Sequence, residues 1–223
     1  VIGGGDYVSD GDGLTDCDAH GTLVAGLIAA RPSPQDSFSG IAPDATILSI
    51  RQNSGSYSVA GNKGDTTDNV SEGYGNTTTL AYAITRAVNL GATVINISAA
   101  ACASSSSKVD DGALGRAVRA AFRRNVVVVA AAGNIDKDSC AQNPAVDPNL
   151  PRERAWPSMT TYATPAWFSE YVLTVGSMTR DAAPSDFSLI GPWVSVAAPG
   201  EDVISLSSTG SGLVNRQVLK GEQ

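Results

Sequence analysis

The chain has 223 residues, of which 42% are hydrophobic and 17% charged, and its formal net charge is −7. A chain of this length buries about 70% of its unfolded surface, and this composition is too apolar for an intrinsically disordered protein. The acidic balance argues against a protein that binds nucleic acids or anionic membranes, because such proteins need a basic face.

Apolar residues recur in blocks that predict, in chain order, a helix, a strand, a helix, a strand, a helix and three further strands. The helices have apolar residues at helical spacing, and the strands are short apolar runs. The expected helices are 20–30, 78–90 and 111–124, and the expected strands are 45–50, 93–98, 126–132, 171–176 and 193–197.

Two details of the helices follow from the sequence. Gly91 comes directly after the second helix, where glycine is the usual C-terminal cap. In the third helix, five apolar side chains are expected to point inward: Leu114, Ala117, Val118, Ala121 and Phe122.

The strands at 93–98 and 126–132 are apolar almost throughout instead of alternating. This pattern is typical of parallel strands that are covered on both faces. The expected fold is therefore α/β, a mostly parallel β-sheet with helices on both faces. Ligands bind beyond the carboxyl ends of the strands in such sheets, so the residues that follow each strand are the candidates for a site.

Two segments interrupt this alternation. Residues 52–77 are rich in Gly, Ser, Asn, Asp and Thr, which predicts a long polar surface loop. Residues 133–169 contain five prolines and two tryptophans without clear periodicity, so we expect ordered but irregular structure there.

Three cysteines stand at 17, 102 and 140, and none has the spacing of a metal site. They are compatible with buried free thiols in a cytosolic protein, or with an exported domain that has one disulfide and one unpaired cysteine. Cys102 and Cys140 each follow an apolar strand, so a bond between them is consistent with the second interpretation.

The chain has one histidine, His20, at the expected start of the first helix and directly before Gly21 and Thr22. A single histidine is more often a surface or core residue than a catalytic one. In the first turn of a helix and among small residues, however, an imidazole can face solvent and be held on one side by a carboxylate, as a general base requires.

Small and amide residues follow two of the strands. The strand at 126–132 is followed by Gly133 and Asn134, and the Asn134 side chain could donate to the oxyanion of a tetrahedral intermediate, although Gly-Asn is also a common turn. The strand at 93–98 ends at Ser98 and continues into Ala99 and Ala100. Such small residues leave an open edge on which an extended peptide could lie.

The residues D-A-H-G-T-L-V-A-G at 18–26 resemble the histidine motif of subtilisin-like serine proteases. Residues 94–98 resemble the strand that forms one wall of the primary specificity pocket in that family, and A-A-A-G-N at 130–134 is similar to its oxyanion segment. Five further segments resemble the mycosins, the subtilases of mycobacterial type VII secretion systems: 1–7, 17–20, 41–45, 164–168 and 190–194.

The resemblance implies a serine endopeptidase that acts on polypeptides without a cofactor or a metal. His20 would be the general base and then acid, Asn134 an oxyanion donor, and Ser98, Ala99, Ala100 and Gly133 would contact the substrate. It also implies a Cys102–Cys140 disulfide, with Cys17 paired to a cysteine outside this chain. The protein would face the periplasm, be anchored by a C-terminal transmembrane helix outside the 223 residues, and bind components of the secretion membrane complex.

The sequence departs from the subtilase pattern at two of the three triad members. A subtilase needs Asp, His and Ser in that order, and none of the early aspartates has the expected Asp-Ser/Thr-Gly context. No Gly-Thr-Ser turn opens a helix near the end; residues 209–212 are expected to be a loop before Leu213. We therefore expect 1–223 to be a partial subtilase domain, incomplete at both ends and inactive alone.

Two alternatives to a protease are a structural component and a nucleotide-binding module. The domain could instead be a structural or capping component of a secretion complex, with the loop at 52–77 as a surface for a partner. A nucleotide-binding module is disfavoured, because no glycine-rich phosphate loop joins a strand to a helix. The chain also has no apolar run near the roughly 20 residues that span a bilayer, and its first residues lack the features of a signal peptide.

Overall fold

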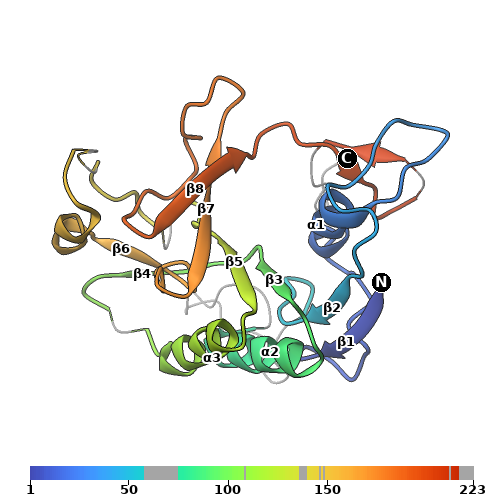
Figure 1. Cartoon of the computed structure of the whole chain (residues 1–223), viewed down its shortest axis with the longest axis horizontal. Helices are drawn as coiled ribbons and strands as arrows, with labels where there is room; N and C mark the ends of the chain where they lie inside the picture. Colours follow the sequence, from blue (N-terminus) through green and yellow to red (C-terminus); the bar gives the residue numbers. More distant parts are fainter. Residues whose placement is uncertain are drawn as a thin grey trace, which may run out of the picture. The chain divides into compact units, whose positions relative to one another are not determined.

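A computed structural model describes residues 1–57, 75–107, 109–135, 140–145, 147, 149–210 and 212–215 (Figure 1). The chain divides into two compact units. The first unit comprises Val1–Ala83 and Asp202–Gln223, and the second comprises Ile84–Glu201. Most of the predicted loop at 52–77 falls on residues 58–74, which lie outside the described residues, as does Ser211 of the predicted loop at 209–212.

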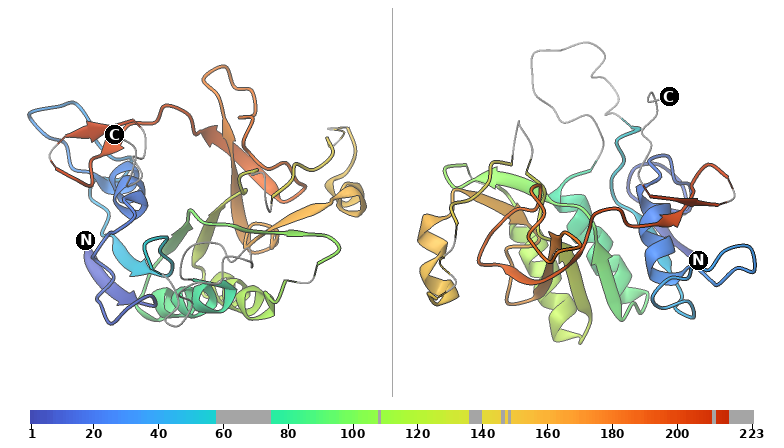
Figure 2. Two further views of the ribbon diagram at one scale, coloured as in Figure 1. Left: turned by 180° about the vertical axis from the view of Figure 1, so that it is seen from behind. Right: turned by 90° about the horizontal axis from the view of Figure 1, so that it is seen from above.

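The first unit is built on two parallel strands and one helix (Figure 2). Strand β1 (Ile2–Asp6) pairs with β2 (Leu48–Arg51), and α1 (His20–Ala29) lies between them in the chain. A short antiparallel pair, β9 (Ser205–Leu206) and β10 (Leu213–Val214), also belongs to this unit. The hydroxyl of Ser205 donates to the carbonyl of Leu23 at 2.6 Å, which fastens β9 to α1.

The second unit contains a four-stranded sheet in the order β3-β5-β7-β8, with every pair parallel. Its strands are β3 (Val94–Ile97), β5 (Val127–Ala131), β7 (Val172–Met178) and β8 (Val194–Pro199). All four were predicted from their apolar runs, and the parallel arrangement is confirmed.

Helix α3 (Gly112–Arg123) packs against β5, and α2 (Thr77–Asn89) begins in the first unit and ends in the second. On the covered face of the sheet, Ile97, Val128 and Val172 are buried. On the other face, apolar side chains are exposed: Val94, Val127, Leu173 and Val196. The strands therefore carry apolar residues on both faces, as the parallel-sheet pattern predicts.

One detail of the helix prediction was wrong. Leu114, Ala117, Val118 and Ala121 of α3 are buried, but Phe122 is 54% exposed. Phe122 lies at the border of the buried stripe and packs beside Tyr171, with ring centroids 5.6 Å apart. The cap of α2 is as predicted: Gly91 has a φ of 87° and donates its N–H to the carbonyl of Val88 at 3.2 Å.

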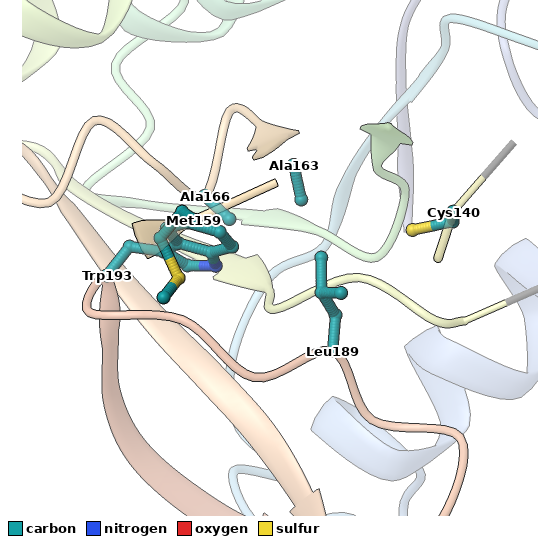
Figure 3. Packing of buried hydrophobic residues seen from close by; sticks show 6 residues of the cluster. All are labelled: Cys140, Met159, Ala163, Ala166, Leu189 and Trp193. Carbon is teal, nitrogen blue, oxygen red and sulfur yellow. The ribbon is translucent and has the colours of Figure 1, made fainter. Parts of the chain in front are cut away.

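The segment at 133–169, predicted to be irregular, contains a regular strand. Strand β6 (Thr161–Thr164) pairs antiparallel with β4 (Ala101–Ser104), and two short 3₁₀ helices, η1 (Arg152–Arg154) and η2 (Trp156–Ser158), precede it. A compact hydrophobic cluster lies beside this pair (Figure 3), formed by Cys140, Met159, Ala163, Ala166, Leu189 and Trp193. Within the described residues, no helix is long and apolar enough to span a bilayer.

Candidate active site

His20 is the first residue of α1, and it is exposed. The residue before it, Ala19, has a left-handed backbone with a φ of 64° and no side chain that could cap the helix. Asp16 supplies the missing acceptor. Its Oδ2 accepts the backbone N–H of Thr22 at 2.8 Å and the Thr22 hydroxyl at 2.6 Å, so a helix N–H that would otherwise lack a partner is satisfied.

The same carboxylate shapes the turn before the helix, because Asp16 Oδ1 accepts the backbone N–H of Asp18 at 3.1 Å. Partial burial raises the pKa of Asp16, but the hydrogen bonds from Thr22 and from nearby backbone amides outweigh it, and the net effect is a lowered pKa. Asp16 is therefore held in its charged, accepting form.

Asp18 and Cys17 are tied to the segment that follows β2. The hydroxyl of Ser56 donates to Asp18 Oδ1 at 2.8 Å and lies 3.2 Å from the Cys17 carbonyl, and the Ser56 N–H donates to the same Asp18 oxygen at 3.1 Å. The turn that leads into His20 is thus held by the side chains of Asp16 and Ser56.

Asp6, at the end of β1, is paired with Arg51 at the end of β2. Arg51 donates to Asp6 Oδ2 from Nε at 2.9 Å and also from Nη2, and the two side chains form an ion pair. Burial raises the pKa of Asp6, but the hydrogen bonds from Arg51 and from the amides of Val8 and Ser9 lower it to about 2. Because Asp6 is paired with Arg51, the structure is consistent with the expectation that Asp6 is not the triad aspartate.

Asn134 is presented by the end of β5 in the second unit. After Ala131 the chain passes through Gly133, which is buried and has a φ of 106°. A side chain at Gly133 would lie 3.1 Å from Ala163 and 3.2 Å from Leu189, so both the backbone conformation and the space favour glycine. Asn134 follows this turn and is exposed.

The backbone on either side of Asn134 is anchored to residues 187–189. Leu189 donates its N–H to the carbonyl of Gly133 at 2.9 Å, and Ile135 donates its N–H to the carbonyl of Phe187 at 2.8 Å. Asn134 itself forms an isolated antiparallel bridge with Ser188. In the described part of the chain, no group hydrogen-bonds to the Asn134 side-chain amide, which is therefore available as a donor.

Ser98, Ala99 and Ala100 follow β3, an outer strand of the four-stranded sheet. They lie outside the strands, Ser98 and Ala100 are exposed, and the Ser98 hydroxyl accepts a hydrogen bond from Asn96 Nδ2 at 2.9 Å.

Two of the three parts of the predicted site share one edge. Ile97, the last residue of β3, pairs with Ala130 of β5, so both strands end together. The segment at 98–100 and the turn at 133–134 therefore follow the carboxyl ends of neighbouring parallel strands, where sites are expected in such sheets. His20 belongs to the first unit, and the catalytic and substrate-binding roles of all these residues remain predictions.

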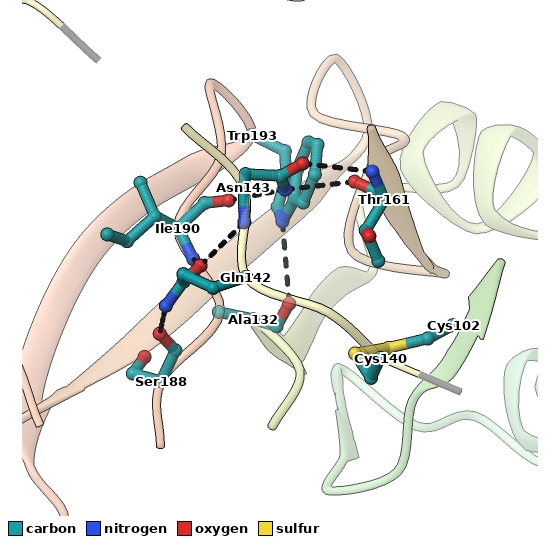
Figure 4. The surroundings of a disulfide bond; sticks show 9 residues. All are labelled: Cys102, Ala132, Cys140, Gln142, Asn143, Thr161, Ser188, Ile190 and Trp193. Atoms are coloured by element: carbon teal, nitrogen blue, oxygen red, sulfur yellow. Dashed lines mark hydrogen bonds between the residues drawn. A yellow bond between two sulfur atoms is a disulfide. The ribbon is translucent and has the colours of Figure 1, made fainter. Parts of the chain in front are cut away.

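The predicted bond between Cys102 and Cys140 is present, with Cα atoms 5.3 Å apart (Figure 4). Cys102 lies within β4, a strand that was not predicted from the sequence. Cys17 is exposed and unpaired within this chain. Over the ranges that the structure describes, no group of three or more His, Cys, Asp or Glu residues could hold a metal ion.

Three residues that the sequence did not predict support the candidate residues through side-chain hydrogen bonds: Asp16, Gln142 and Asn143. Asp16 precedes the helix by four positions instead of one, so the usual capping pattern does not identify it. Apart from the Asn143 N–H that Gln142 accepts, the partners of the two side chains lie 17 to 48 positions away along the chain, and no local sequence pattern indicates such contacts.

Comparison with known proteins shows the family of this chain. The subtilase family (peptidase S8) matches residues 3–222. The chain is 51% identical to Mycosin-4 of Mycobacterium tuberculosis over 218 residues, covering 97% of this chain and 45% of that protein.

Two solved structures are similar over almost the whole chain. The MycP3 protease from the type VII (ESX-3) secretion system has 43% identity and a TM-score of 0.87, covering 99% of this chain and 60% of that one. A chain of an intact ESX-5 inner membrane complex has 45% identity and a TM-score of 0.83, covering 96% of this chain and 53% of that one.

The chain spans about half the length of the curated relatives it matches. The likeness to these solved structures confirms the subtilisin-like fold that the motifs at 18–26 and 130–134 predicted. With its histidine motif at the start of α1 and its A-A-A-G-N segment at the end of β5, the chain belongs to the subtilase family.

Proposed function

We propose that the protein containing this chain is a membrane-associated, mycosin-like serine endopeptidase of a type VII secretion system. The observation that carries the proposal is the placement of Asn134. Its amide is exposed and without a hydrogen-bond partner among the described residues, beyond the carboxyl end of a buried parallel strand. Gly133 and the segment at 187–189 hold its backbone, as a preorganised oxyanion donor requires.

In this mechanism a serine outside the 223 residues attacks the scissile carbonyl of a polypeptide. His20 accepts the serine proton as general base and then returns it to the leaving amine as general acid. The N–H of the Asn134 side chain donates to the oxyanion of the tetrahedral intermediate. An aspartate outside the chain would orient the imidazole, since Asp6 is paired with Arg51 and Asp16 caps α1.

The substrate would lie in an extended conformation along residues 98–100 and against Gly133. Ser98, Ala99 and Ala100 have small side chains, and they follow an outer strand. Peptide binding by strand addition needs such an accessible backbone edge. Residues 1–223 then act as one partial subtilase domain, with 52–77 as a surface loop.

The proposed setting rests on the solved relatives. One chain of similar sequence belongs to an intact ESX-5 inner membrane complex, and another to the periplasmic assembly of the ESX-5 inner membrane complex. By analogy, this protein would bind components of a type VII membrane complex on the periplasmic side. A C-terminal transmembrane helix outside the chain would anchor it, and a cysteine outside the chain would pair with Cys17.

The test of the enzymatic proposal is His20→Ala in the full-length protein, with peptidase activity and assembly of the membrane complex measured in parallel. We expect activity to fall by roughly 10⁴-fold or more, because removal of a triad member has an effect of this order. The complex should remain assembled. Unchanged activity would overturn the role of His20.

A second function is supported by the same membrane-complex structures. The protein could act mainly as a structural or capping component, with proteolysis secondary. Deletion of residues 52–77 distinguishes the two functions. The structural role predicts loss of assembly whatever residue stands at position 20, whereas the enzymatic role alone predicts an assembled complex.

A further inference from the structure

We infer that Gln142 and Asn143 are positioning residues for Asn134, acting through the segment at 187–190. The inference rests on the proposed oxyanion role of Asn134. Neither residue is assigned a contact with the substrate; each holds the backbone against which the Asn134 turn is hydrogen-bonded.

One edge of the segment at 187–190 faces the Asn134 turn. The carbonyl of Phe187 accepts the Ile135 N–H at 2.8 Å, and the Leu189 N–H donates to Gly133 at 2.9 Å. In an extended chain, successive residues direct their N–H and C=O groups to alternate sides. The carbonyl of Ser188 and the N–H of Ile190 therefore point to the opposite edge.

Gln142 occupies that opposite edge. Its Nε2 donates to the Ser188 carbonyl at 2.9 Å, and its Oε1 accepts the Ile190 N–H at 2.9 Å (Figure 4). A single side-chain amide thus makes the two hydrogen bonds that a peptide group of a neighbouring strand would make. The segment at 187–190 is held on both edges, by the Asn134 turn and by Gln142.

Asn143 connects the same segment to β6. Its Nδ2 donates to the carbonyl of Ile190 at 2.7 Å and to that of Thr161 at 2.9 Å. Its Oδ1 accepts the N–H groups of Thr160 and Thr161, each at 2.9 Å. Asn143 is 4% exposed, and every donor and acceptor position of its amide is used. A fully satisfied buried amide of this kind is rigid.

A disulfide and a further hydrogen bond also support the Asn134 turn; together with the contacts of Gln142 and Asn143 they form a frame around it. Cys140, two residues before Gln142, is bonded to Cys102 of β4, and Cys102 pairs with Ala163 of β6. The indole N–H of Trp193, a fully buried side chain, lies 3.4 Å from the carbonyl of Ala132, on the strand end that leads to Asn134. The Asn134 turn is therefore connected through hydrogen bonds and a disulfide to a second, antiparallel pair of strands.

This frame matters because an oxyanion donor is effective only near 2.7–3.1 Å from the developing charge, and displacement by about 1 Å can cost roughly 10²-fold in rate. Loosening one edge of 187–190 should displace the donor only partly. The expected effect of losing the Gln142 amide is a fall of about tenfold in kcat, with KM changed by less than about twofold, since the contact acts on the transition state.

The test uses the full-length protein and the variants Gln142→Met, Asn134→Ala and the double variant. Met preserves the length of the side chain and removes all three of its hydrogen bonds, including the one that Gln142 Oε1 accepts from the Asn143 N–H at 3.0 Å. The maximal rate is divided by the concentration of active sites, titrated with a fluorophosphonate, to give kcat, so that loss of folded protein is not counted as loss of kcat. In the Asn134→Ala background, we expect Gln142→Met to have no further effect on kcat, because the group that it positions is absent.

Gln35→Met is the control. The Oε1 of Gln35 also accepts a hydrogen bond, from the Ser33 hydroxyl at 2.6 Å, but it lies in an exposed turn after α1 that has no part in the proposed site. We expect its kcat per titrated site to equal that of the wild type. Should Gln142→Met not accumulate, Gln142→Glu serves the same purpose. It keeps the acceptor for Ile190, loses the donor to Ser188, and is suited to this exposed position.

The outcomes separate the two proposals. An unchanged kcat in Asn134→Ala overturns the oxyanion role itself. A lowered kcat in Asn134→Ala, together with an unchanged kcat in Gln142→Met or Gln142→Glu, overturns the positioning role alone. Losses that multiply in the double variant also overturn it, because they show that Gln142 acts independently of Asn134.

Discussion

The carboxylate of Asp16 accepts two hydrogen bonds from Thr22, one from its backbone N–H at 2.8 Å and one from its hydroxyl at 2.6 Å. His20 lies between these two residues in the chain and begins the helix that they cap. The Asp16 carboxylate therefore fixes the backbone that carries the candidate general base, and within the described residues it forms no hydrogen bond with the imidazole itself.

Removal of this cap should weaken both the helix and the catalytic geometry. For Asp16→Ala we expect the free energy of unfolding to fall by about 1 kcal/mol, the usual value of a cap, and kcat/KM to fall with it. Urea unfolding and peptidase assays measure the two effects. Thr22→Val, which keeps the backbone N–H contact, should cause a smaller loss of both. Equal stability of Asp16→Ala and the wild type would refute the capping role.

Gly133 provides a second test, because its φ of 106° and its two close neighbours both disfavour a side chain. We expect Gly133→Ala to destabilise the protein by about 1–3 kcal/mol and to lower kcat by displacing Asn134. Gly210→Ala is the control, since a side chain there would meet nothing within 4 Å. Similar thermal stability of the two variants would contradict the proposed constraint at Gly133.

The elements that the sequence predicted share one property: their signal is local. Helix α3 was recognisable from the spacing of Leu114, Val118 and Ala121, and β5 from its run of valines. Strand β1 was not recognised, because its glycines carry no apolar pattern and its parallel pairing with β2 spans more than 40 residues. Strand β6 was missed for a related reason: its residues form a strand by pairing with β4, about 60 positions away.

The ion pair between Asp6 and Arg51 predicts a specific dependence of stability on pH. The pKa of Asp6 is about 2 in the folded protein, against an ordinary value of 3.8. A carboxyl whose pKa is lowered on folding stabilises the protein above its unfolded pKa, and this contribution is lost as the pH falls through the folded pKa. Between about pH 4 and pH 2, the free energy of unfolding should fall by about 1 kcal/mol as this contribution of Asp6 is lost, allowing for solvent screening.

Urea unfolding at pH 7 and near pH 2 measures this loss. In Asp6→Asn, the contribution should be absent at every pH, so its difference from the wild type should shrink as the pH falls. Arg51→Met removes the main partner and should make the remaining dependence on pH shallower. A constant difference between Asp6→Asn and the wild type over this range would show that the pair does not stabilise the fold.

The Cys102–Cys140 bond closes a loop with a sequence separation of 38 residues. A loop of this size predicts a stabilisation of about 4 kcal/mol from the restricted unfolded chain. The double variant Cys102→Ser, Cys140→Ser should lose stability of this order and, because Cys140 precedes Gln142, some activity as well. Peptide mapping without reduction should recover the two cysteines in one linked peptide. Alkylation of both thiols before reduction would contradict the bond.

In the candidate site, as in the fold, the residues with a local sequence signal were predicted and those that depend on distant contacts were not. His20, Asn134 and the segment at 98–100 were predicted because short motifs carry them, and the structure places Asn134 and residues 98–100 beyond the carboxyl ends of adjacent strands. The supporting residues Asp16, Gln142 and Asn143 were not predicted. Their role exists only once distant segments have come together, and polar side chains in loops give no sequence signal for such contacts.

The central claim is that this chain supplies the general base of a serine endopeptidase, and fluorophosphonate labelling of the full-length protein tests it most directly. Intact mass and peptide mapping identify the labelled residue. We predict one labelled serine outside residues 1–223 in the wild type and no labelling in His20→Ala. Equal labelling of the wild type and His20→Ala, or no labelling of a wild-type protein whose mass extends beyond both ends of this chain, would contradict the account.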